Sequence, residues 1–551
     1  MARFLWSNLL IQKKDYKDNK NKKNVKNYNS DKRTDFQKDY DRIVFMSSFR
    51  RLQDKAQVFP LEKNDFIRTR LTHSIEVANI ASELGEGVVD FIIADEQKNG
   101  IKFNKKLINQ IPLLLKNAAL IHDLGNPPFG HITENLISQW FENNFKRIYY
   151  DKGGKYCLSQ NDVFDNLQKE LGNVANDFIR FDGNAQTLRI VDTLYDENLS
   201  KPLLSIIIKY PIEYDEAYNV INQFKKGRII FASEYNLYKS INDELNLNGH
   251  RHPLTYLLEA ADDIAYSTSD IQDSIRKGLF TPFDLLIDFI GEIVKHIDCG
   301  GSKKELLISD LHSIYCSILK TLYYLVIECV KDNIDEEELH NLKINSEKQD
   351  GESSYRLCLI DMKNKVKEAS KIKLGIEKEK QLTSKLLITI KGKLINLAIK
   401  QFFSMYKKYM DPESVEDQER ITKAEFLKKY ELLSSNRVAG LVVEFLKSEL
   451  VKYTYYSNDI VKDKIISQKV INKLLDYFVI PMLNVDFDKR EDSSNYLIYK
   501  LLPQEFLEKH NKIKVPGGEQ VNKIYRRLAM VVDFISGMTD SYAMEIYKLI
   551  C

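Results

Sequence analysis

Apolar residues recur at steps of three and four along most of this chain, and only 22 glycines and 12 prolines interrupt its 551 residues. An α-helix completes a turn about every 3.6 residues, so this spacing gathers apolar side chains on one helix face. The clearest example runs from Leu71 to Ala94, and further helices are predicted over residues 111–124, 184–194, 254–277, 280–330 and 384–455. β-Branched residues at 203–209 and 228–232 are consistent with one small hairpin. The predicted fold class is therefore all-α, with that hairpin as its only sheet.

Polar segments separate the predicted helices. The first 40 residues are predicted to be irregular, and residues 141–182 and 332–354 are predicted to be loops. Lysine-rich runs at 13–38 and 363–380 are predicted to be solvated surfaces, with an anionic partner as the alternative.

Overall composition argues against several classes of protein. The 81 lysines and arginines offset 79 acidic residues, so net charge gives no sign of a nucleic-acid partner. The six cysteines are scattered without a CxxC pair, which favours a reducing compartment over a disulfide framework or a thiolate zinc site. No apolar run approaches the roughly 20 residues that span a bilayer. We therefore expect a cytoplasmic protein without a membrane segment.

Histidine and aspartate side chains occur at three apolar helix segments: His73, the pair His122-Asp123, and Asp262. An ionised aspartate at the end of a buried helix is costly unless another charge compensates it, and a divalent cation is one such charge. Imidazoles and carboxylates suit Mg²⁺, Mn²⁺, Fe²⁺ or Co²⁺ better than a thiolate-rich set would. The alternative is that each histidine is a core or helix-capping residue whose ring is satisfied by the backbone.

The segment Gly125–Gly130 must end the preceding helix, since it contains two consecutive prolines. The next helix is predicted to start after this segment, with His131 and Glu134 three residues apart on one of its faces. A histidine oriented by a carboxylate beside a metal is the arrangement expected of a proton-transfer or nucleophilic pair. The alternative is a surface pair at the start of a helix.

Asp262, Tyr266 and Asp270 follow one another at steps of four on a single face of the helix predicted at 254–277. A carboxylate, an aromatic hydroxyl and a second carboxylate along one wall are typical of a lined pocket. The alternative is an acidic first turn that balances the helix dipole.

The order His73, His122-Asp123 and Asp262 resembles the H…HD…D signature of HD-domain phosphohydrolases, whose fold is a helical bundle around one metal ion. Longer strings are similar to those of bacterial deoxyguanosinetriphosphate triphosphohydrolases, and they lie at residues 49–61, 68–74, 122–131, 181–186, 259–266 and 533–540. Because these strings span most of the chain, the resemblance implies one enzyme with an HD-domain catalytic core at residues 41–280. Residues 281–551 would form a helical C-terminal region that completes the enzyme, and residues 1–40 a polar N-terminal segment.

The resemblance implies that His73, His122, Asp123 and Asp262 hold one divalent metal ion. Asp262 is preferred over its neighbour Asp263 because the tyrosine and aspartate that the family's spacing requires stand four and eight positions after it. The expected metal is Mg²⁺ or Mn²⁺, with Co²⁺, Fe²⁺, Ni²⁺ or Zn²⁺ as alternatives.

The resemblance also implies roles in catalysis and substrate binding. His131 would act at the α-phosphate or its attacking water, with Glu134 orienting it. The implied substrate contacts are Gln53 at the 3′-hydroxyl end of the sugar, Arg70 and Lys209 at phosphates, Tyr266 against the deoxyribose, and Asn184, Tyr210 and Asp270 as further pocket residues.

The predicted function is metal-dependent hydrolysis of deoxynucleoside triphosphates, dGTP first among them, to deoxynucleoside and inorganic triphosphate. One alternative is another HD-family phosphohydrolase, such as a nucleotidase or a cyclic- or signalling-nucleotide phosphodiesterase. A second alternative is a nucleic-acid-binding regulatory HD protein. The family further implies an even-numbered homo-oligomer, such as a hexamer, and single-stranded DNA or a nucleotide effector as a partner.

Overall fold

The computed structural model describes residues 3–11, 33–62, 64–194, 198–212, 230–298, 319–334, 336–342, 352–372, 374–411, 431–485 and 493–550. Helices dominate these ranges, and the described residues contain a single two-stranded sheet, which confirms the predicted all-α class. Within the same ranges, no helix combines the length and apolar character needed to cross a membrane. The chain forms two compact units, the first from Met1–Leu258, Tyr406–Phe426 and Lys462–Cys551, the second from Glu259–Met405 and Leu427–Val461.

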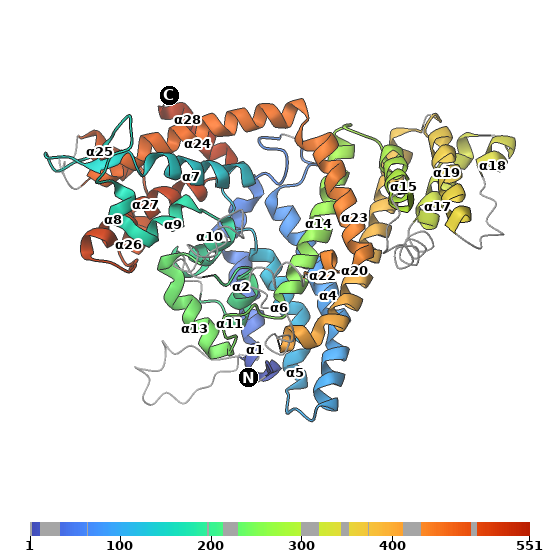
Figure 1. The fold of residues 1–551 in the computed structure, drawn as a ribbon, viewed down its shortest axis with the longest axis horizontal. Helices are drawn as coiled ribbons and strands as arrows, with labels where there is room; N and C mark the ends of the chain where they lie inside the picture. Colours follow the sequence, from blue (N-terminus) through green and yellow to red (C-terminus); the bar gives the residue numbers. More distant parts are fainter. Residues whose placement is uncertain are drawn as a thin grey trace. The chain divides into compact units, whose positions relative to one another are not determined.

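The first unit begins with the helices that carry the candidate site (Figure 1). In chain order these are α1 (Trp6–Leu9), α2 (Asp35–Phe45), α3 (Ser47–Arg51), the 3₁₀ turn η2 (Leu52–Asp54), α4 (Arg70–Lys98), α5 (Lys105–Ile108), α6 (Ile111–Ile121) and α7 (His131–Asn144). Shorter elements follow: α8 (Leu167–Leu171), η3 (Gly172–Ala175), α9 (Asn176–Ile179), α10 (Gly183–Arg189), the π-helical turn η4 (Ile190–Leu194), α11 (Lys201–Ile207), η5 (Ala232–Glu234) and α13 (Tyr235–Leu245).

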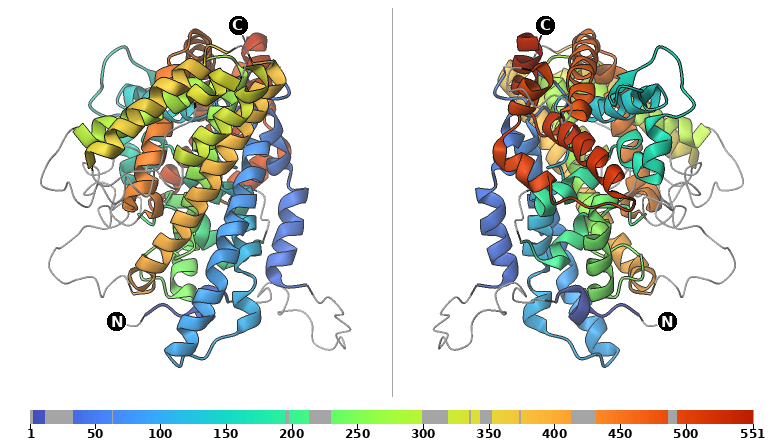
Figure 2. Two further views of the ribbon diagram at one scale, coloured as in Figure 1. Left: turned by 90° about the vertical axis from the view of Figure 1, so that its right-hand side faces the viewer. Right: turned by 90° about the vertical axis from the view of Figure 1, so that its left-hand side faces the viewer.

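Helices α4 and α6 pack along each other and form the frame of the site (Figure 1, Figure 2). Helix α4 begins where the Thr69 and Thr72 side chains each accept a hydrogen bond from the other's backbone amide. Its buried positions include His73, Val77 and Leu84, which follow the three- and four-residue steps predicted from the sequence. Apolar packing therefore fixes the helix that carries the first candidate ligand.

The first unit ends with α24 (Asn458–Asn484) from Lys462 onward, α25 (Ser494–Lys500), α26 (Gln504–His510), α27 (Glu519–Ser536) and α28 (Asp540–Ile550). These helices share a hydrophobic core with α7 and α9. The Phe178 ring centroid lies 5.3 Å from that of Phe141 and 5.2 Å from that of Tyr525. The C-terminal helices are therefore an integral part of the unit that holds α4 and α6.

The sheet pairs β1 (Ile148–Tyr150) with β2 (Tyr156–Leu158) in antiparallel register. The hairpin predicted at 203–209 and 228–232 is wrong, because α11 spans Lys201–Ile207 with a proline in its first turn, and residues 228–229 lie outside the described ranges. Most of α11 is buried, and a short buried apolar run has the same composition in a helix as in a strand. The segment predicted as a loop at 141–182 instead contains this hairpin and three short helical elements.

Within the predicted irregular segment at 1–40, the described residues 3–11 and 33–40 contain helical turns. The Trp6 side chain is buried, and its indole Nε1–H donates to the Tyr406 hydroxyl at 2.7 Å. Helix α2 begins at Asp35, where a capping box on Thr34 closes its first turn. Most of the lysine-rich run at 13–38 lies outside the described residues.

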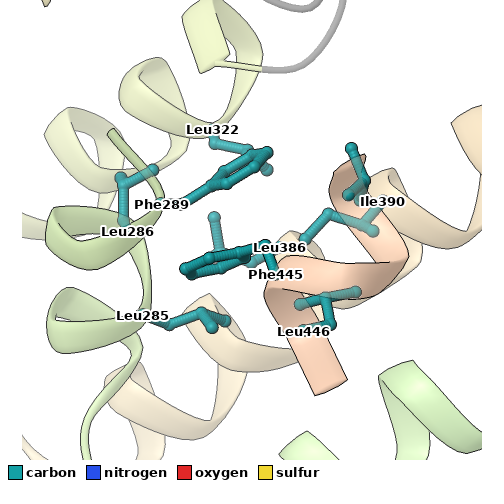
Figure 3. A pocket seen from close by; sticks show the side chains of 9 residues that line it. Leu285, Leu286, Phe289, Leu322, Leu386, Ile390, Phe445 and Leu446 are labelled. Carbon is teal, nitrogen blue, oxygen red and sulfur yellow. The ribbon is translucent and has the colours of Figure 1, made fainter. Parts of the chain in front are cut away.

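The second unit comprises α14 (Thr255–Arg276) from Glu259, α15 (Pro282–Asp298), α17 (Lys320–Val330), η7 (Lys331–Asn333), α18 (Glu336–Leu342), α19 (Glu352–Ala369), most of α20 (Ile376–Met410), α22 (Leu432–Ser435), α23 (Arg437–Glu449) and the π-helical turn η9 (Leu450–Tyr455). Side chains that include Phe289 and Phe445 surround a cavity of about 10 Å³ (Figure 3). Its wall is wholly apolar and it holds at most about one water molecule, so it is a packing gap and not a ligand site.

Two charged stretches of the second unit can be compared with the sequence prediction. The acidic stretch predicted as a loop at 332–354 contains α18, while residues 343–351 lie outside the described ranges. The lysine-rich run at 363–380 lies largely on α19 and α20, where Lys378 pairs with Asp332 at 3.2 Å. Part of this basic run is therefore engaged in ion pairs within the chain.

Candidate active site

The candidate site lies where the start of α4 meets the end of α6. His73 stands in the first turn of α4, and His122 and Asp123 directly follow α6. Ligand atoms of these three side chains all lie within 4.8 Å of one another, and the two imidazole centroids are 5.6 Å apart. In the described part of the chain, no other group of three or more histidine, cysteine or acidic side chains meets this condition. The structure thus brings together three of the four predicted metal ligands.

A backbone hydrogen bond orients the His122 ring. Its Nδ1–H donates to the Ala119 carbonyl oxygen at 2.7 Å, and its Nε2 lies 3.4 Å from Asp123 Oδ1. This bond makes Nε2 the nitrogen with a lone pair, on the side of the carboxylate, as a metal-binding imidazole requires. Two imidazoles and a carboxylate at these distances fit a divalent cation.

Arg70 lies beside this cluster in the first turn of α4. Its Nη1 donates to Asp123 Oδ2 at 2.5 Å, and its side chain is 1% exposed. Its Nε and Nη2 have no hydrogen-bond partner among the described residues. Buried N–H groups without acceptors are costly, so an anion that accepts from them would stabilise the site.

The turn that follows Asp123 packs tightly against α10. The Gly125 amide donates to the Thr187 hydroxyl at 2.9 Å, and that hydroxyl donates to the Gly183 carbonyl oxygen at 2.9 Å. A Cβ on Gly125 would lie 2.1 Å from the Gly183 oxygen, so a side chain has no room there. The close approach of these two segments holds the His122-Asp123 pair in place.

Glu134, in the first turn of α7, contacts the start of α10, where Asn184 stands. The Gly183 amide donates to Glu134 Oε1 at 3.1 Å, and Asp182 Oδ1 accepts from the backbone and side-chain nitrogens of Asn184, each at 2.8 Å. Glu134 therefore anchors the first turn of α10. The backbone of His131 begins α7, but its side chain lies outside the described residues, so the His131–Glu134 pair remains a prediction.

Three further residues of the first unit were predicted to contact substrate: Gln53, Lys209 and Tyr210. Gln53 is exposed in η2. The Lys209 carbonyl oxygen accepts a hydrogen bond from the Arg251 guanidinium, whose carbon atom lies 5.2 Å from the centre of the Tyr210 ring. Arg251 thus holds the backbone of this segment, and the substrate contacts of the three residues remain predictions.

Asp262, Tyr266 and Asp270 lie on α14, in the part that belongs to the second unit. Asp270 is buried, and Asp262 and Tyr266 are partly buried. The neighbouring Asp263 is engaged within its own unit, because Lys447 Nζ lies 2.7 Å from its Oδ1. The choice of Asp262 as the ligand and its place beside the His73 cluster remain predictions.

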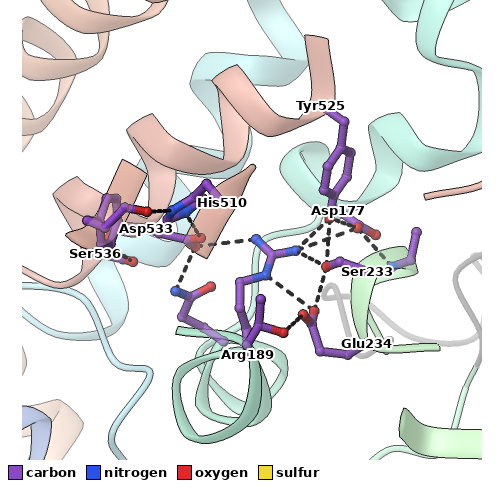
Figure 4. A network of polar contacts seen from close by, with 12 residues as sticks. Asp177, Arg189, Ser233, Glu234, His510, Tyr525, Asp533 and Ser536 are labelled. Atoms are coloured by element: carbon purple, nitrogen blue, oxygen red, sulfur yellow. Dashed lines mark hydrogen bonds and ion pairs between the residues drawn. The ribbon is translucent and has the colours of Figure 1, made fainter. Parts of the chain in front are cut away.

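Helix α10 ends in a buried ion cluster around Arg189 (Figure 4). The guanidinium lies 3.9 Å from Asp177, 3.2 Å from Glu234 and 3.3 Å from Asp533. Burial raises the pKa of Asp177 to about 7, although Arg189 opposes this shift. Burial acts in the same direction on Asp533, but Arg189 and His510 outweigh it and hold the pKa of that carboxyl below its usual value. The cluster ties α10, which supports the site turn, to α27.

Sequence reasoning singled out the strings at 181–186 and 533–540 but not the contacts between them. Gln186 Nε2 donates to Asp533 Oδ1 at 2.8 Å. Thr187 and Arg189, which support the site turn and its helix, were not predicted at all. Local periodicity cannot predict a contact between segments so far apart in the chain. The similarity of both strings to one family was the only signal in the sequence that related them.

Comparisons with known proteins show the family to which the chain is similar. Residues 70–171 match the family model of the HD domain, and residues 435–549 match that of the phosphohydrolase-associated domain. The chain is 32% identical over 528 residues, 94% of each chain, to deoxyguanosinetriphosphate triphosphohydrolase-like proteins of Listeria innocua and Listeria monocytogenes. It is 25% identical over 557 aligned positions, 93% of each chain, to the deoxyguanosinetriphosphate triphosphohydrolase of Yersinia pestis.

Proposed function

This chain belongs to the HD-domain deoxyguanosinetriphosphate triphosphohydrolase family, and on that premise we propose that it hydrolyses deoxynucleoside triphosphates, dGTP first among them, to deoxynucleoside and inorganic triphosphate. The observation that carries the proposal is the convergence of His73, His122 and Asp123, with ligand atoms within 4.8 Å of one another. The buried guanidinium of Arg70 beside them has N–H groups that lack an acceptor among the described residues and can donate to an anion. A metal-binding cluster next to an anion-binding group is what hydrolysis of a triphosphate needs.

The proposed metal ligands are His73, His122, Asp123 and Asp262. We expect one divalent cation, Mg²⁺ or Mn²⁺ in the first place and Co²⁺, Fe²⁺, Ni²⁺ or Zn²⁺ as alternatives. Such a cation, when bound, polarises a phosphoryl oxygen and lowers the pKa of a coordinated water. The Ala119 carbonyl supports this role by keeping the His122 Nε2 lone pair on the side of Asp123.

The chain's own side chains are proposed to bind the phosphates and move protons. A water oxygen forms a bond to the α-phosphorus, the bond from phosphorus to the 5′-oxygen breaks, and the 5′-oxygen takes up a proton. Arg70, and Lys209 as a second cation, would donate to phosphate oxygens on which negative charge develops. His131 would accept the proton of the attacking water or supply that of the 5′-oxygen, with Glu134 orienting its ring.

Selection of the sugar is proposed to depend on Tyr266. A tyrosine ring packed on C2′ of deoxyribose leaves no room and no hydrogen-bond partner for a 2′-hydroxyl. Gln53 would bind the 3′-hydroxyl, and Asn184, Tyr210 and Asp270 would line the same pocket.

The wider organisation of the enzyme is also proposed. Residues 41–280 would form the catalytic core and residues 281–551 would complete it, as the similarity over 94% of the Listeria innocua relative supports. An even-numbered homo-oligomer, binding of single-stranded DNA or a nucleotide effector, and a cytoplasmic location remain predictions.

Product analysis with each deoxynucleoside and ribonucleoside triphosphate, with and without Mg²⁺ or Mn²⁺, tests the proposal. We expect inorganic tripolyphosphate and deoxynucleoside from the deoxy series alone, and loss of both products in His122→Ala. His340→Ala, on helix α18 of the second unit, serves as the histidine control and should behave as the unaltered protein. Release of pyrophosphate or monophosphate would instead favour another HD-family phosphohydrolase.

A further inference from the structure

The lysine of the sequence string at 49–61 is buried beside the site turn. The Lys55 side chain is almost fully enclosed, with 3% of the residue exposed. Its ammonium group donates to the Asn126 carbonyl oxygen at 2.6 Å and to the Ser536 carbonyl oxygen at 2.9 Å. The Lys55 carbonyl in turn accepts from the Arg70 amide at 2.9 Å, at the start of α4. Lys55 therefore connects the site turn, the C-terminal string and the helix of the first candidate ligand.

Asp540, at the start of α28, binds the same turn at a second point. Its Oδ1 accepts from the Phe129 amide at 2.8 Å and its Oδ2 accepts from the Ala56 amide at 3.1 Å. The two carboxylate oxygens thus accept hydrogen bonds from backbone N–H groups of two different segments. The residue is 2% exposed, so water cannot easily replace either bond.

The turn needs such support because of its backbone conformation. Phe129 and Gly130 have positive φ angles of 61° and 75°. A bulky residue such as phenylalanine is disfavoured in the left-handed region and persists there only when its surroundings hold it. The Phe129 amide is the group that Asp540 binds.

The charges of Lys55 and Asp540 stabilise each other in this buried environment. Burial lowers the pKa of Lys55 to about 7, and the charge of Asp540 acts against that shift. Burial raises the pKa of Asp540 to about 6, and the Phe129 and Ala56 amides and the charge of Lys55 act against that shift. Removal of either partner therefore disfavours the ionised form of the other.

We propose that Lys55 and Asp540 are positioning residues that clamp turn 126–130 in its strained conformation. The clamp sets the placement of Asp123, before the turn, relative to α7, which begins with His131 after it. Neither residue acts on the substrate itself. The catalytic consequence rests on the proposed function, whereas the clamp and its effect on metal binding do not.

The test is Asp540→Asn, which preserves the shape of the side chain but can accept from only one of the two amides with its single carbonyl oxygen. We expect hydrogen–deuterium exchange at the turn amides to accelerate about tenfold or more. We expect Mn²⁺ affinity and kcat each to fall by about 10- to 100-fold, the range typical of groups that orient metal ligands, while KM stays within about threefold. Lys55→Met should show the same pattern, since it leaves two buried carbonyls without their donor.

Ser541→Ala is the matched control. Its hydroxyl donates to Asp54 Oδ1 at 3.0 Å, so it joins the same two chain segments on the exposed side without reaching the turn. We expect this variant to match the unaltered protein in all four measurements. Equal effects in Ser541→Ala and Asp540→Asn, or unchanged turn exchange and Mn²⁺ affinity in Asp540→Asn, would overturn the proposal.

The two proposals can fail separately. Turn exchange and Mn²⁺ affinity require no substrate, so their expected change in a protein that hydrolyses no deoxynucleotide would support the clamp and refute the proposed function. Normal hydrolysis in Asp540→Asn, with an unchanged turn, would refute the clamp alone. If Lys55→Met does not fold, Asp540→Asn decides the outcome.

Discussion

Substitution of Gly125 by alanine should damage both stability and activity. The added Cβ would lie 2.1 Å from the Gly183 carbonyl oxygen, 2.4 Å from the Thr187 nitrogen and 2.8 Å from the Gln186 carbonyl carbon. All three are backbone atoms of α10, so no side-chain rotation can relieve the overlap. Non-bonded carbon and oxygen atoms need about 3.5 Å, so the site turn and α10 must separate by more than about 1 Å.

The cost follows from that displacement. Overpacking of a filled interior costs about 1–3 kcal/mol, and loss of the hydrogen bond from Gly125 to Thr187 adds about 1 kcal/mol. The expected destabilisation of the first unit is therefore about 2–4 kcal/mol. His122 and Asp123 lie three and two positions before Gly125 in the chain, so a shift of about 1 Å in these proposed metal ligands should also lower the rate by about 100-fold.

The assay compares the urea midpoint and kcat of Gly125→Ala with those of Gly392→Ala. Gly392 lies inside α20, and a Cβ there would meet no atom within 4 Å. Alanine is the better helix former by about 0.5–1 kcal/mol, so this control should raise the midpoint and leave kcat unchanged. Gly125→Ala protein with an unchanged midpoint and a kcat within about twofold of normal would refute the close packing of the turn on α10.

Three further predictions concern the ligands and the buried ion cluster. His73→Ala should weaken Mn²⁺ binding by more than about 100-fold, since even groups that only orient ligands contribute about 10- to 100-fold; retention of normal affinity in a calorimetric titration would remove His73 from the ligand set. Arg189→Met should destabilise the first unit by about 3–5 kcal/mol, because it leaves buried carboxylates without their counter-charge, and an unchanged urea midpoint at neutral pH would contradict this. The pKa of Asp177 is raised by burial to about 7, so the folded protein keeps a proton on this carboxyl that the unfolded chain releases near its usual value of 3.8. The stabilising contribution of that proton is complete below the pKa of the unfolded chain and is lost as pH rises through about 7. Asp177→Asn should remove this component of the pH dependence of stability. Parallel stability–pH curves for Asp177→Asn and the unaltered protein would contradict the prediction.

The sequence alone predicted the helices that carry the proposed ligands and the order of these residues along the chain. Helix α4 contains the predicted span from Leu71 to Ala94, and Gly278 ends the predicted helix at 254–277 with a φ of 72°. These predictions depend on periodicity and on residues such as glycine that determine the backbone locally. The same local signals placed His73 near the start of one predicted helix, and His122 and Asp123 near the end of another.

The hairpin shows where local reasoning failed. Residues 203–207 are apolar except Ser205 and include the β-branched Ile206 and Ile207, yet they form the buried helix α11, which Pro202 helps to start. The strands β1 and β2 contain aromatic residues and are joined by the turn Asp151-Lys152-Gly153-Gly154, but the polar residues that surround them in segment 141–182 obscure this signal. Burial on all sides removes the polar–apolar alternation that distinguishes a strand from a helix.

Only the tertiary structure decided which polar residues support the site. By composition, Lys55 and Arg189 are expected at the surface, yet both are buried and bind groups from the C-terminal helices. Their partners Ser536 and Asp533 lie hundreds of positions further along the chain. The sequence indicates the apolar face of each helix but not which helix faces pack together. Whether a charged side chain can be buried depends on the partner that folding brings to it.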